Sequence, residues 1–207
     1  MGSDIKRYGQ AKIGTLVLAH GAGAGMDSDF MVAFAEGLSS GGFETILLEF
    51  PYMTKRREDG KKRPPDRAPK LVAHYNAVLE ELALPGPVII GGKSMGGRIA
   101  SMLLAENPIV ADGLLMLGYP FAPPGKPEKL RIDHFSAIEK PVLIVQGERD
   151  VFGGRAAVEA LSLPKNFEIL WCNDGDHSFK PRKTSGLTEQ ENWEAAMNAI
   201  SKSSLFS

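Results

Sequence analysis

The sequence predicts an α/β protein, a three-layer α/β/α sandwich built around a mostly parallel sheet of about six strands. Short apolar runs rich in Val, Ile and Leu alternate with stretches of helical periodicity along the chain. The runs are apolar throughout, which is typical of parallel strands covered by helices on both faces. The chain has 207 residues, 43% of them hydrophobic, and its single cysteine excludes an internal disulfide framework. We therefore expect one domain over residues 1–207.

The first half of the chain repeats an apolar run, a glycine turn and a helix. Residues 13–19 form a β-branched run that stops at the glycine-rich residues 20–25, so we expect a strand followed by a turn. Apolar side chains at mostly helical spacing predict a helix over residues 29–38, which ends before two glycines. Residues 43–50 again have the character of a strand, and residues 71–84 that of a helix.

The second half continues the alternation. A buried strand is expected at residues 88–91, and it runs into a helix over residues 95–106. The later apolar runs predict strands and the periodic stretches predict helices. These strands lie at residues 113–117, 141–147 and 167–172, and these helices lie at residues 156–161 and 189–200.

Two stretches interrupt the alternation and are expected to be irregular segments that border a cleft. Residues 55–70 hold eight Lys and Arg against three Asp and Glu, in a chain whose formal net charge is −1. Residues 119–140 hold four prolines and join one strand to the next. Cations beside a cleft, from residues 55–70 together with Arg131, favour an anionic or phosphate-bearing acyl donor. The alternative is a solvated loop whose charges only aid solubility.

The charge balance and the hydropathy exclude several classes of partner. A net charge of −1 gives no overall field that attracts nucleic acid, and residues 55–70 contain no aromatic side chain to stack on bases. No run of 18 or more apolar residues predicts a membrane span, and the polar N-terminal segment lacks the apolar stretch of a secretory signal. We expect a cytoplasmic protein that acts on a small molecule, with no nucleic-acid or membrane partner.

The most informative motif joins a strand to a helix. Gly92, Ser94 and Gly96 form G-x-S-x-G at the end of an apolar run, which is the pattern of a nucleophile elbow. Glycines on both sides of the serine remove side chains that would collide at so sharp a turn, and the following helix points the positive end of its dipole at the site. Gly92-Lys93-Ser94 also resembles the end of a phosphate-binding loop, but Pro87 stands where that motif needs its first glycine.

A reactive serine needs a base and a carboxylate that orients the base, and both follow later strands. Asp150 lies just after residues 141–147, and His177 follows the last predicted strand. The chain order Ser94, Asp150, His177 is the order expected for this elbow. Glu148 is the alternative orienting acid, and Asp174 or Asp176 could help to orient the histidine, although Asp176, as its immediate neighbour, is poorly placed. The other three histidines lie in the first glycine loop, on a helix and in the proline-rich segment, so none of them follows the last strand.

The oxyanion of an acyl intermediate needs amide donors. We predict the backbone N–H groups of Met95, directly after the serine, and of Ala22 in the first glycine loop, with Gly23 as the alternative to Ala22. His20 in the same loop is interpreted as a structural hydrogen-bonding residue. No His, Cys or Asp pair has the spacing of zinc ligands, so no metal site is predicted. The candidate substrate-binding residues are Gly21, Gly23, Lys93 and Arg131.

A set of motifs spread along the chain supports this interpretation: Ala19-His20-Gly21-Ala22-Gly23, Phe50-Pro51-Tyr52, Gly92-Lys93-Ser94-Met95-Gly96-Gly97-Arg98, Leu117-Gly118-Tyr119-Pro120, Pro123-Pro124-Gly125-Lys126-Pro127, residues 131–135 and Gln146-Gly147-Glu148-Arg149-Asp150. With these motifs the sequence resembles the α/β-hydrolase superfamily over almost its whole length. More narrowly, it resembles the small lidless group similar to dienelactone hydrolases. That group includes predicted bacterial hydrolases, the testis-expressed hydrolase-like proteins and a subunit of the NSL chromatin acetyltransferase complex.

The resemblance implies hydrolysis of a carboxylic ester or thioester through an acyl-enzyme intermediate, with Ser94, Asp150 and His177 as the catalytic residues. It implies no cofactor and a minimal or absent cap. Because the N-terminal segment is too short for the first two strands of larger members, it also implies a minimal six-stranded sheet. The chromatin-complex relative makes a non-catalytic interaction module the alternative, and the complete set of three catalytic residues argues against it.

Overall fold

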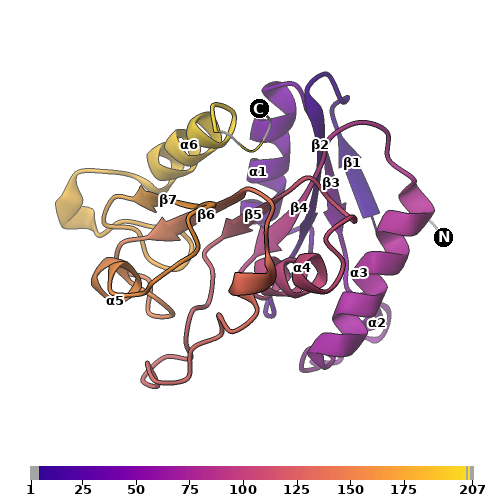
Figure 1. Cartoon of the computed structure of the whole chain (residues 1–207). Coiled ribbons are helices and arrows are strands. Elements are labelled where there is room, and N and C mark those ends of the chain that lie inside the picture. Colours follow the sequence, from indigo (N-terminus) through magenta and orange to yellow (C-terminus); the bar gives the residue numbers. More distant parts are fainter. Residues whose placement is uncertain (1–4, 204, 206–207) are drawn as a thin grey trace.

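The computed structural model describes residues 5–203 and 205. Its centre is one sheet of seven strands in the order β1-β3-β2-β4-β5-β6-β7 (Figure 1). Strands β2 to β7 are parallel to their neighbours, and β1 pairs antiparallel with β3. The predicted sandwich with a mostly parallel sheet is confirmed, whereas the expected number of six strands is one too few.

The helices and strands alternate along the chain as the sequence predicts, and four of them, β5, β7, α4 and α6, have the predicted bounds. The strands are β1 (Ile5–Tyr8), β2 (Gly14–Ala19), β3 (Phe43–Leu48), β4 (Val88–Lys93), β5 (Gly113–Leu117), β6 (Val142–Gly147) and β7 (Phe167–Cys172). The helices are α1 (Asp29–Ser40), α2 (Pro51–Asp59), α3 (Ala68–Leu82), α4 (Met95–Glu106), α5 (Arg155–Glu159) and α6 (Glu189–Ile200), with short 3₁₀ turns η1 (Phe135–Ala137) and η2 (Lys183–Ser185).

The additional strand, β1, lies at the edge of the sheet. Its two central residues, Lys6 and Arg7, are exposed, and the Arg7 guanidinium donates to the Glu44 carboxylate of β3 over 2.6 Å. A charged edge strand lacks the continuous apolar run by which the buried strands are predicted. This composition explains why the sequence analysis missed it.

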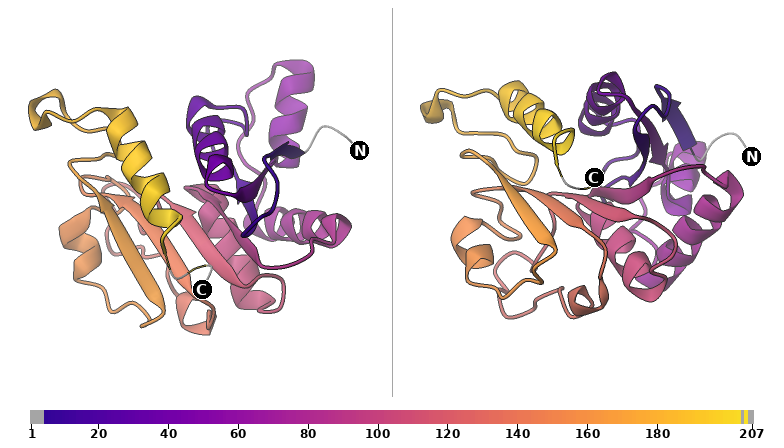
Figure 2. Two further views of the ribbon diagram at one scale, coloured as in Figure 1. Left: turned by 90° about the horizontal axis from the view of Figure 1, so that it is seen from above. Right: turned by 45° about the horizontal axis from the view of Figure 1, so that its top comes forward.

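The helices cover both faces of the sheet and define two cores. Helices α1 and α6 lie over one face, and α3, α4 and α5 lie over the other (Figures 1 and 2). Alternate residues of each central strand enter opposite cores: in β2, Val17 joins the core under α3 and α4, whereas Leu16 and Leu18 join the core under α1. This two-sided burial is the physical origin of the continuous apolar runs in the sequence.

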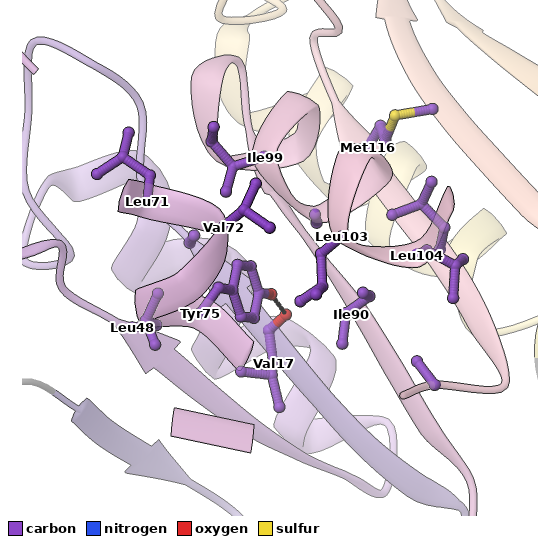
Figure 3. Close-up of a cluster of buried hydrophobic side chains, with 14 of the residues drawn as sticks. Val17, Leu48, Leu71, Val72, Tyr75, Ile90, Ile99, Leu103, Leu104 and Met116 are labelled. Atoms are coloured by element: carbon purple, nitrogen blue, oxygen red, sulfur yellow. Dashed lines mark hydrogen bonds between the residues drawn. The ribbon is translucent and has the colours of Figure 1, made fainter. Parts of the chain in front are cut away.

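Tyr75 of α3 connects the larger core to the strand that carries the elbow (Figure 3). Its hydroxyl donates to the Val17 carbonyl over 2.5 Å and accepts from the Gly91 N–H over 3.1 Å. A Cβ on Gly91 would lie 1.9 Å from the Leu115 carbonyl oxygen, so only glycine allows β4 and β5 to pair at this point. Through its two hydrogen bonds, the Tyr75 hydroxyl holds β4 in place near the end of the strand that leads into the elbow.

The two stretches that interrupt the alternation, residues 55–70 and 119–140, differ in structure. Within the basic stretch, residues 55–59 belong to α2, which begins with Pro51 at its first turn and ends at Gly60 in the left-handed conformation. The sequence analysis expected an irregular segment there, although proline at the start and glycine at the end are helix signals. Residues 119–140 contain only the 3₁₀ turn η1, in agreement with the expectation. Neither segment forms a separate cap domain in the described part of the chain.

Among all the residues that the structure describes, no helix combines the length and apolar character needed to cross a membrane.

Candidate active site

The nucleophile elbow has the backbone geometry that its motif predicts. Ser94 follows β4 with φ 52° and ψ −113°, a conformation that non-glycine residues rarely adopt. A Cβ on Gly92 would lie 2.2 Å from the Ala19 carbonyl oxygen, and a Cβ on Gly96 would lie 2.1 Å from the same atom. The two glycines therefore let the turn pack against the end of β2. The surrounding hydrogen bonds hold Ser94 in its strained conformation, with its amide donating to the Leu117 carbonyl over 2.9 Å.

The structure brings the three predicted catalytic side chains together from three loops. The His177 Nε2 atom lies 2.9 Å from the Ser94 hydroxyl oxygen, and the Nδ1 atom lies 2.7 Å from an oxygen of Asp150. The Asp150 side chain is fully buried, whereas 24% of the His177 side chain is exposed. Since Asp150 is an acceptor, Nδ1 carries the proton and Nε2 presents its lone pair to the serine.

Asp150 is held by more than the histidine. Gln146 of β6 donates from Nε2 to Asp150 over 3.0 Å, and the Phe152 amide donates to the second carboxylate oxygen over 2.8 Å. Gln146 is itself fixed, because its side-chain oxygen accepts from the Tyr119 amide over 2.7 Å. The sequence analysis gave Gln146 no role. A polar residue in an otherwise apolar strand, four positions before the acid, was the available signal.

The alternative acid, Glu148, is directed away from the histidine. Its carboxylate accepts from the Asp174 amide over 2.8 Å and from Arg155 over 2.8 Å. These contacts lower its pKa, the backbone hydrogen bond first and the Arg155 contact second. Asp174 pairs with Arg182, which lowers the pKa of Asp174 to about 2. Of these carboxylates, Asp150 is the one that contacts His177.

The predicted oxyanion donors lie beside the serine. Ala22, Ser94 and Met95 line one cavity of about 320 Å³. Met95 is the first residue of α4, where an amide has no acceptor within the helix, and the helix dipole adds positive potential there. A Cβ on Gly21 would lie 3.7 Å from Ser94 Cβ, so the first glycine loop passes close to the serine, whereas a Cβ on Gly23 would meet open space.

Helix α2 fixes this glycine loop. The Tyr52 hydroxyl donates to the Ala22 carbonyl over 3.0 Å. The buried Glu49 carboxylate accepts from the Met26 amide over 2.8 Å and from Arg57, which also pairs with Asp27 over 2.5 Å. Part of the basic stretch thus holds the loop of the predicted oxyanion donor. Only the Phe50-Pro51-Tyr52 motif pointed to this contact from the sequence.

His20 is structural in its contacts, as predicted. Its Nε2 atom accepts from the Phe50 amide over 3.1 Å, and its Nδ1 atom donates to the Gly21 carbonyl over 2.7 Å. Burial lowers its pKa, so the ring is neutral. Both ring nitrogens are occupied by the backbone, which leaves none for proton transfer.

Lys93 is not where a substrate-binding residue is expected. Its side chain is buried, and the ammonium donates to the His177 carbonyl and lies over the rings of Phe30, at 5.1 Å, and Phe179, at 5.6 Å. Burial lowers its pKa to about 8. Lys93 does not line the cavity of Ser94, and its ammonium contacts the histidine loop. Arg131, in contrast, does line that cavity.

A second serine and histidine pair lies near the first. The hydroxyl oxygen of Ser101 is 2.7 Å from His134 Nε2, and the hydroxyl donates to the Arg98 carbonyl over 2.8 Å. Ser101 is fully buried in α4, and burial lowers the pKa of His134 to about 4. In the described residues, no group of three or more His, Cys, Asp and Glu side chains is arranged to hold a metal ion.

Comparisons with known proteins identify the family and the fold. The family described as "Alpha/beta hydrolase domain" matches residues 12–204. Similar solved structures include a dienelactone hydrolase from Anabaena variabilis, with a TM-score of 0.72 and 21% identity over 96% of this chain and 89% of that chain. Another is an α/β serine hydrolase without a lid from Xanthomonas campestris, with a TM-score of 0.67 and 18% identity over 95% of this chain and 85% of that chain.

A third similar structure is Est1E from Butyrivibrio proteoclasticus, with ferulic acid bound. Its TM-score is 0.68 at 17% identity, and the match covers 95% of each chain. At these identities the three structures share the fold with this protein.

Proposed function

The chain belongs to the α/β-hydrolase family, and on that premise we propose that it acts as one serine hydrolase domain on a carboxylic ester or thioester. The observation that carries the proposal is the continuous chain of hydrogen bonds from Ser94 through His177 to the buried Asp150. The strained elbow supports it further, because such strain persists where a nucleophile is presented.

The acylation step follows from the hydrogen-bonding roles of these residues. His177 Nε2 takes the proton of the Ser94 hydroxyl as the oxygen attacks the carbonyl carbon, and Asp150 stabilises the imidazolium that forms. The carbonyl electron pair moves onto its oxygen, which accepts from the amides of Ala22 and Met95. When this pair returns, the bond to the leaving group breaks, and His177 gives its proton to the departing oxygen or sulfur.

Deacylation repeats the same chemistry with water. His177 removes a proton from a water molecule that attacks the acyl carbon, and the second oxyanion uses the same two amides. Collapse releases the carboxylic acid and returns the proton to the Ser94 oxygen. The chain's own residues supply every proton transfer in this scheme.

The narrower assignment is to the lidless hydrolases similar to dienelactone hydrolases. The similar lidless hydrolase and the dienelactone hydrolase support it, as does the ferulic acid bound to Est1E, which is a carboxylic acid. The cavity of about 320 Å³ beside Ser94 suits a small acyl group.

The test is covalent labelling with a neutral fluorophosphonate, followed by mass mapping and by hydrolysis of short-chain p-nitrophenyl esters. We expect labelling at Ser94, and its loss in Ser94→Ala and His177→Ala. Ser101→Ala is the matched control, because it removes the serine of the other pair and is expected to keep both labelling and hydrolysis. If folded protein is neither labelled nor active, the proposal is wrong and a non-catalytic interaction module takes its place.

A further inference from the structure

We propose that Arg98 and Arg131 form an anion-binding subsite beside Ser94, and that the substrate is an ester whose acyl chain ends in a carboxylate. The inference rests on the proposed function, and it identifies the substrate class of the same site. Its basis is the presence of the two arginines in the cavity of Ser94, their lack of carboxylate partners and the apolar side chains that line the same cavity.

Both arginines line the cavity that contains Ser94. Arg98 lies one turn into α4, with its amide donating to the Ser94 carbonyl over 3.1 Å, so it is on the same side of the helix as the nucleophile. Arg131 comes from the proline-rich segment 119–140. Its backbone is fixed by the Tyr119 hydroxyl, which donates to the Arg131 carbonyl over 2.6 Å, and by its own amide, which donates to the Phe121 carbonyl over 2.9 Å.

Neither arginine is neutralised by a carboxylate. Among the residues that the structure describes, neither forms an ion pair, and the buried Nε atom of Arg98 has no hydrogen-bond partner. Partial burial and the positive charge of Arg98 lower the pKa of Arg131. Two neighbouring cations that are partly removed from water are stabilised when an anion binds between them.

The carboxylates near the arginines do not fill this role. Asp66, which lines the same cavity, pairs with Lys70 over 2.9 Å. Glu106 and Asp133 line an adjoining cavity of about 440 Å³ together with both arginines, yet neither forms an ion pair with them in the described structure. The guanidinium groups therefore keep their hydrogen-bonding capacity for a ligand.

The basic stretch 55–70, which the sequence analysis associated with an anionic substrate, is a weaker candidate. Arg57 pairs with Asp27 and Glu49, and Arg63 pairs with Asp59. Lys70 pairs with Asp66. These three cations are matched with carboxylates, and none of the eight Lys and Arg of the stretch lines the cavity of Ser94, whereas Arg98 and Arg131 do. We therefore assign anion binding to the two arginines that line the cavity and not to the charged stretch 55–70.

The remaining lining favours a chain of methylene groups between the two functional ends. Leu71 and Ile99 line the cavity together with Met95, and these side chains pair with apolar surface. A monoester of a short dicarboxylic acid offers one group for each part of this lining, an ester carbonyl for Ser94, methylenes for the apolar side chains and a carboxylate for the arginines. Arginine binds carboxylates through two parallel hydrogen bonds, which sets the orientation of such a substrate.

The test compares p-nitrophenyl hydrogen adipate with its methyl ester, p-nitrophenyl methyl adipate, which differs by the absence of the charge. We expect the wild-type kcat/KM to be at least about 10-fold higher for the anionic ester. Arg131→Gln and Arg98→Gln are expected to lower the ratio of the two values by about 10- to 100-fold each, since each removes charge-assisted hydrogen bonds. Arg131→Lys keeps the charge without the planar fork and should retain part of the preference.

Arg67→Gln is the matched control. Arg67 is exposed, lies next to the cavity-lining residues Asp66 and Ala68, and does not line the cavity itself. We expect its ratio to equal that of the wild type. If the neutral ester is hydrolysed as well as the anionic one, or if Arg67→Gln changes the ratio as much as Arg131→Gln does, the subsite is wrong while the hydrolase function stands.

A binding measurement separates the two proposals. Calorimetric titration of Ser94→Ala with adipate needs no turnover, and binding should weaken about 10-fold or more when Arg131→Gln is added. If no ester is hydrolysed and Ser94 is not labelled, the proposed function fails, and the titration still decides the subsite. Absence of adipate binding, or binding that Arg131→Gln leaves unchanged, overturns it.

Discussion

The two serine and histidine pairs of this protein have nearly the same oxygen-to-nitrogen distance but different surroundings. The separation is 2.9 Å for Ser94 and His177 and 2.7 Å for Ser101 and His134. Ser94 lies at a strained turn and faces a cavity, whereas Ser101 is fully buried within α4. A short contact between serine and histidine therefore does not identify a nucleophile.

The difference lies in the direction of the hydrogen bonds. Asp150 accepts the Nδ1 proton of His177, so the Nε2 atom of His177 is the acceptor that faces Ser94. The Ser101 hydroxyl donates to the Arg98 carbonyl, so His134 must donate from Nε2 to the Ser101 oxygen. The first histidine is arranged as a base, and the second as a structural donor that fixes residues 119–140 against α4.

The largest expected effect tests the carboxylate that distinguishes the first pair. Asp150→Asn keeps the shape of the side chain but favours the wrong histidine tautomer, and we expect kcat for a p-nitrophenyl ester to fall by about 10⁴-fold. Glu148→Gln is the matched control, because Glu148 contacts Arg155 and the Asp174 amide instead of His177, and it should change kcat less than about 10-fold. Equal losses in the two variants would contradict the assigned orientation of His177. Steady-state kinetics at a fixed pH measures both.

A smaller effect is expected from Lys93, which contacts the histidine loop of the first pair. Burial lowers the pKa of Lys93 from 10.5 to about 8, so between these values the unfolded chain binds more protons than the folded one. Stability therefore rises with pH in this window. Relative to Lys93→Met, the free energy of unfolding of the wild type should increase by about 2 kcal/mol between pH 7 and pH 10.

Urea unfolding of both proteins at the two pH values measures this change. The difference between the proteins removes the contribution of other groups that titrate in the same range. Lys93→Arg is the second variant, because a guanidinium stays charged over the whole window, and its difference from Lys93→Met should be independent of pH. A wild type whose difference from Lys93→Met does not change with pH would mean that Lys93 is not buried as a cation.

The first pair and its carboxylate could be predicted from the sequence, because the fold places residues that follow parallel strands close together. The carboxyl ends of parallel strands meet at one edge of the sheet, so Ser94 after β4, Asp150 after β6 and His177 after β7 were expected to meet from their positions alone. The G-x-S-x-G motif predicted the elbow at Ser94, because a Cβ at Gly92 or Gly96 would clash with the Ala19 carbonyl oxygen of the neighbouring strand.

The contacts that were not predicted depend on side-chain direction across long loops. Lys93 stands between Gly92 and Ser94 in the motif, and nothing in the sequence indicates that its ammonium points toward the His177 carbonyl. Gln146 was visible as a polar residue in an apolar strand, but its partner Tyr119 comes from another segment. Arg98 was visible beside the glycines of the motif, but Arg131, which lines the same cavity, comes from another segment. The pairing of Arg57 could not be predicted for the same reason, because its carboxylate partners Asp27 and Glu49 lie outside residues 55–70.

The smallest expected effect concerns the second pair and its structural role. Burial, followed by the positive charge of Arg98, lowers the pKa of His134 from 6.5 to about 4. The unfolded chain binds more protons than the folded one between these values, so this contribution to stability is complete above pH 6.5 and is lost as the pH falls toward 4. The ring is partly exposed, which reduces the contribution to about 1 kcal/mol relative to His134→Gln. Proton NMR of the ring should give a midpoint near 4, and a midpoint near 6.5 would mean that His134 is free in water and does not fix the segment that carries Arg131.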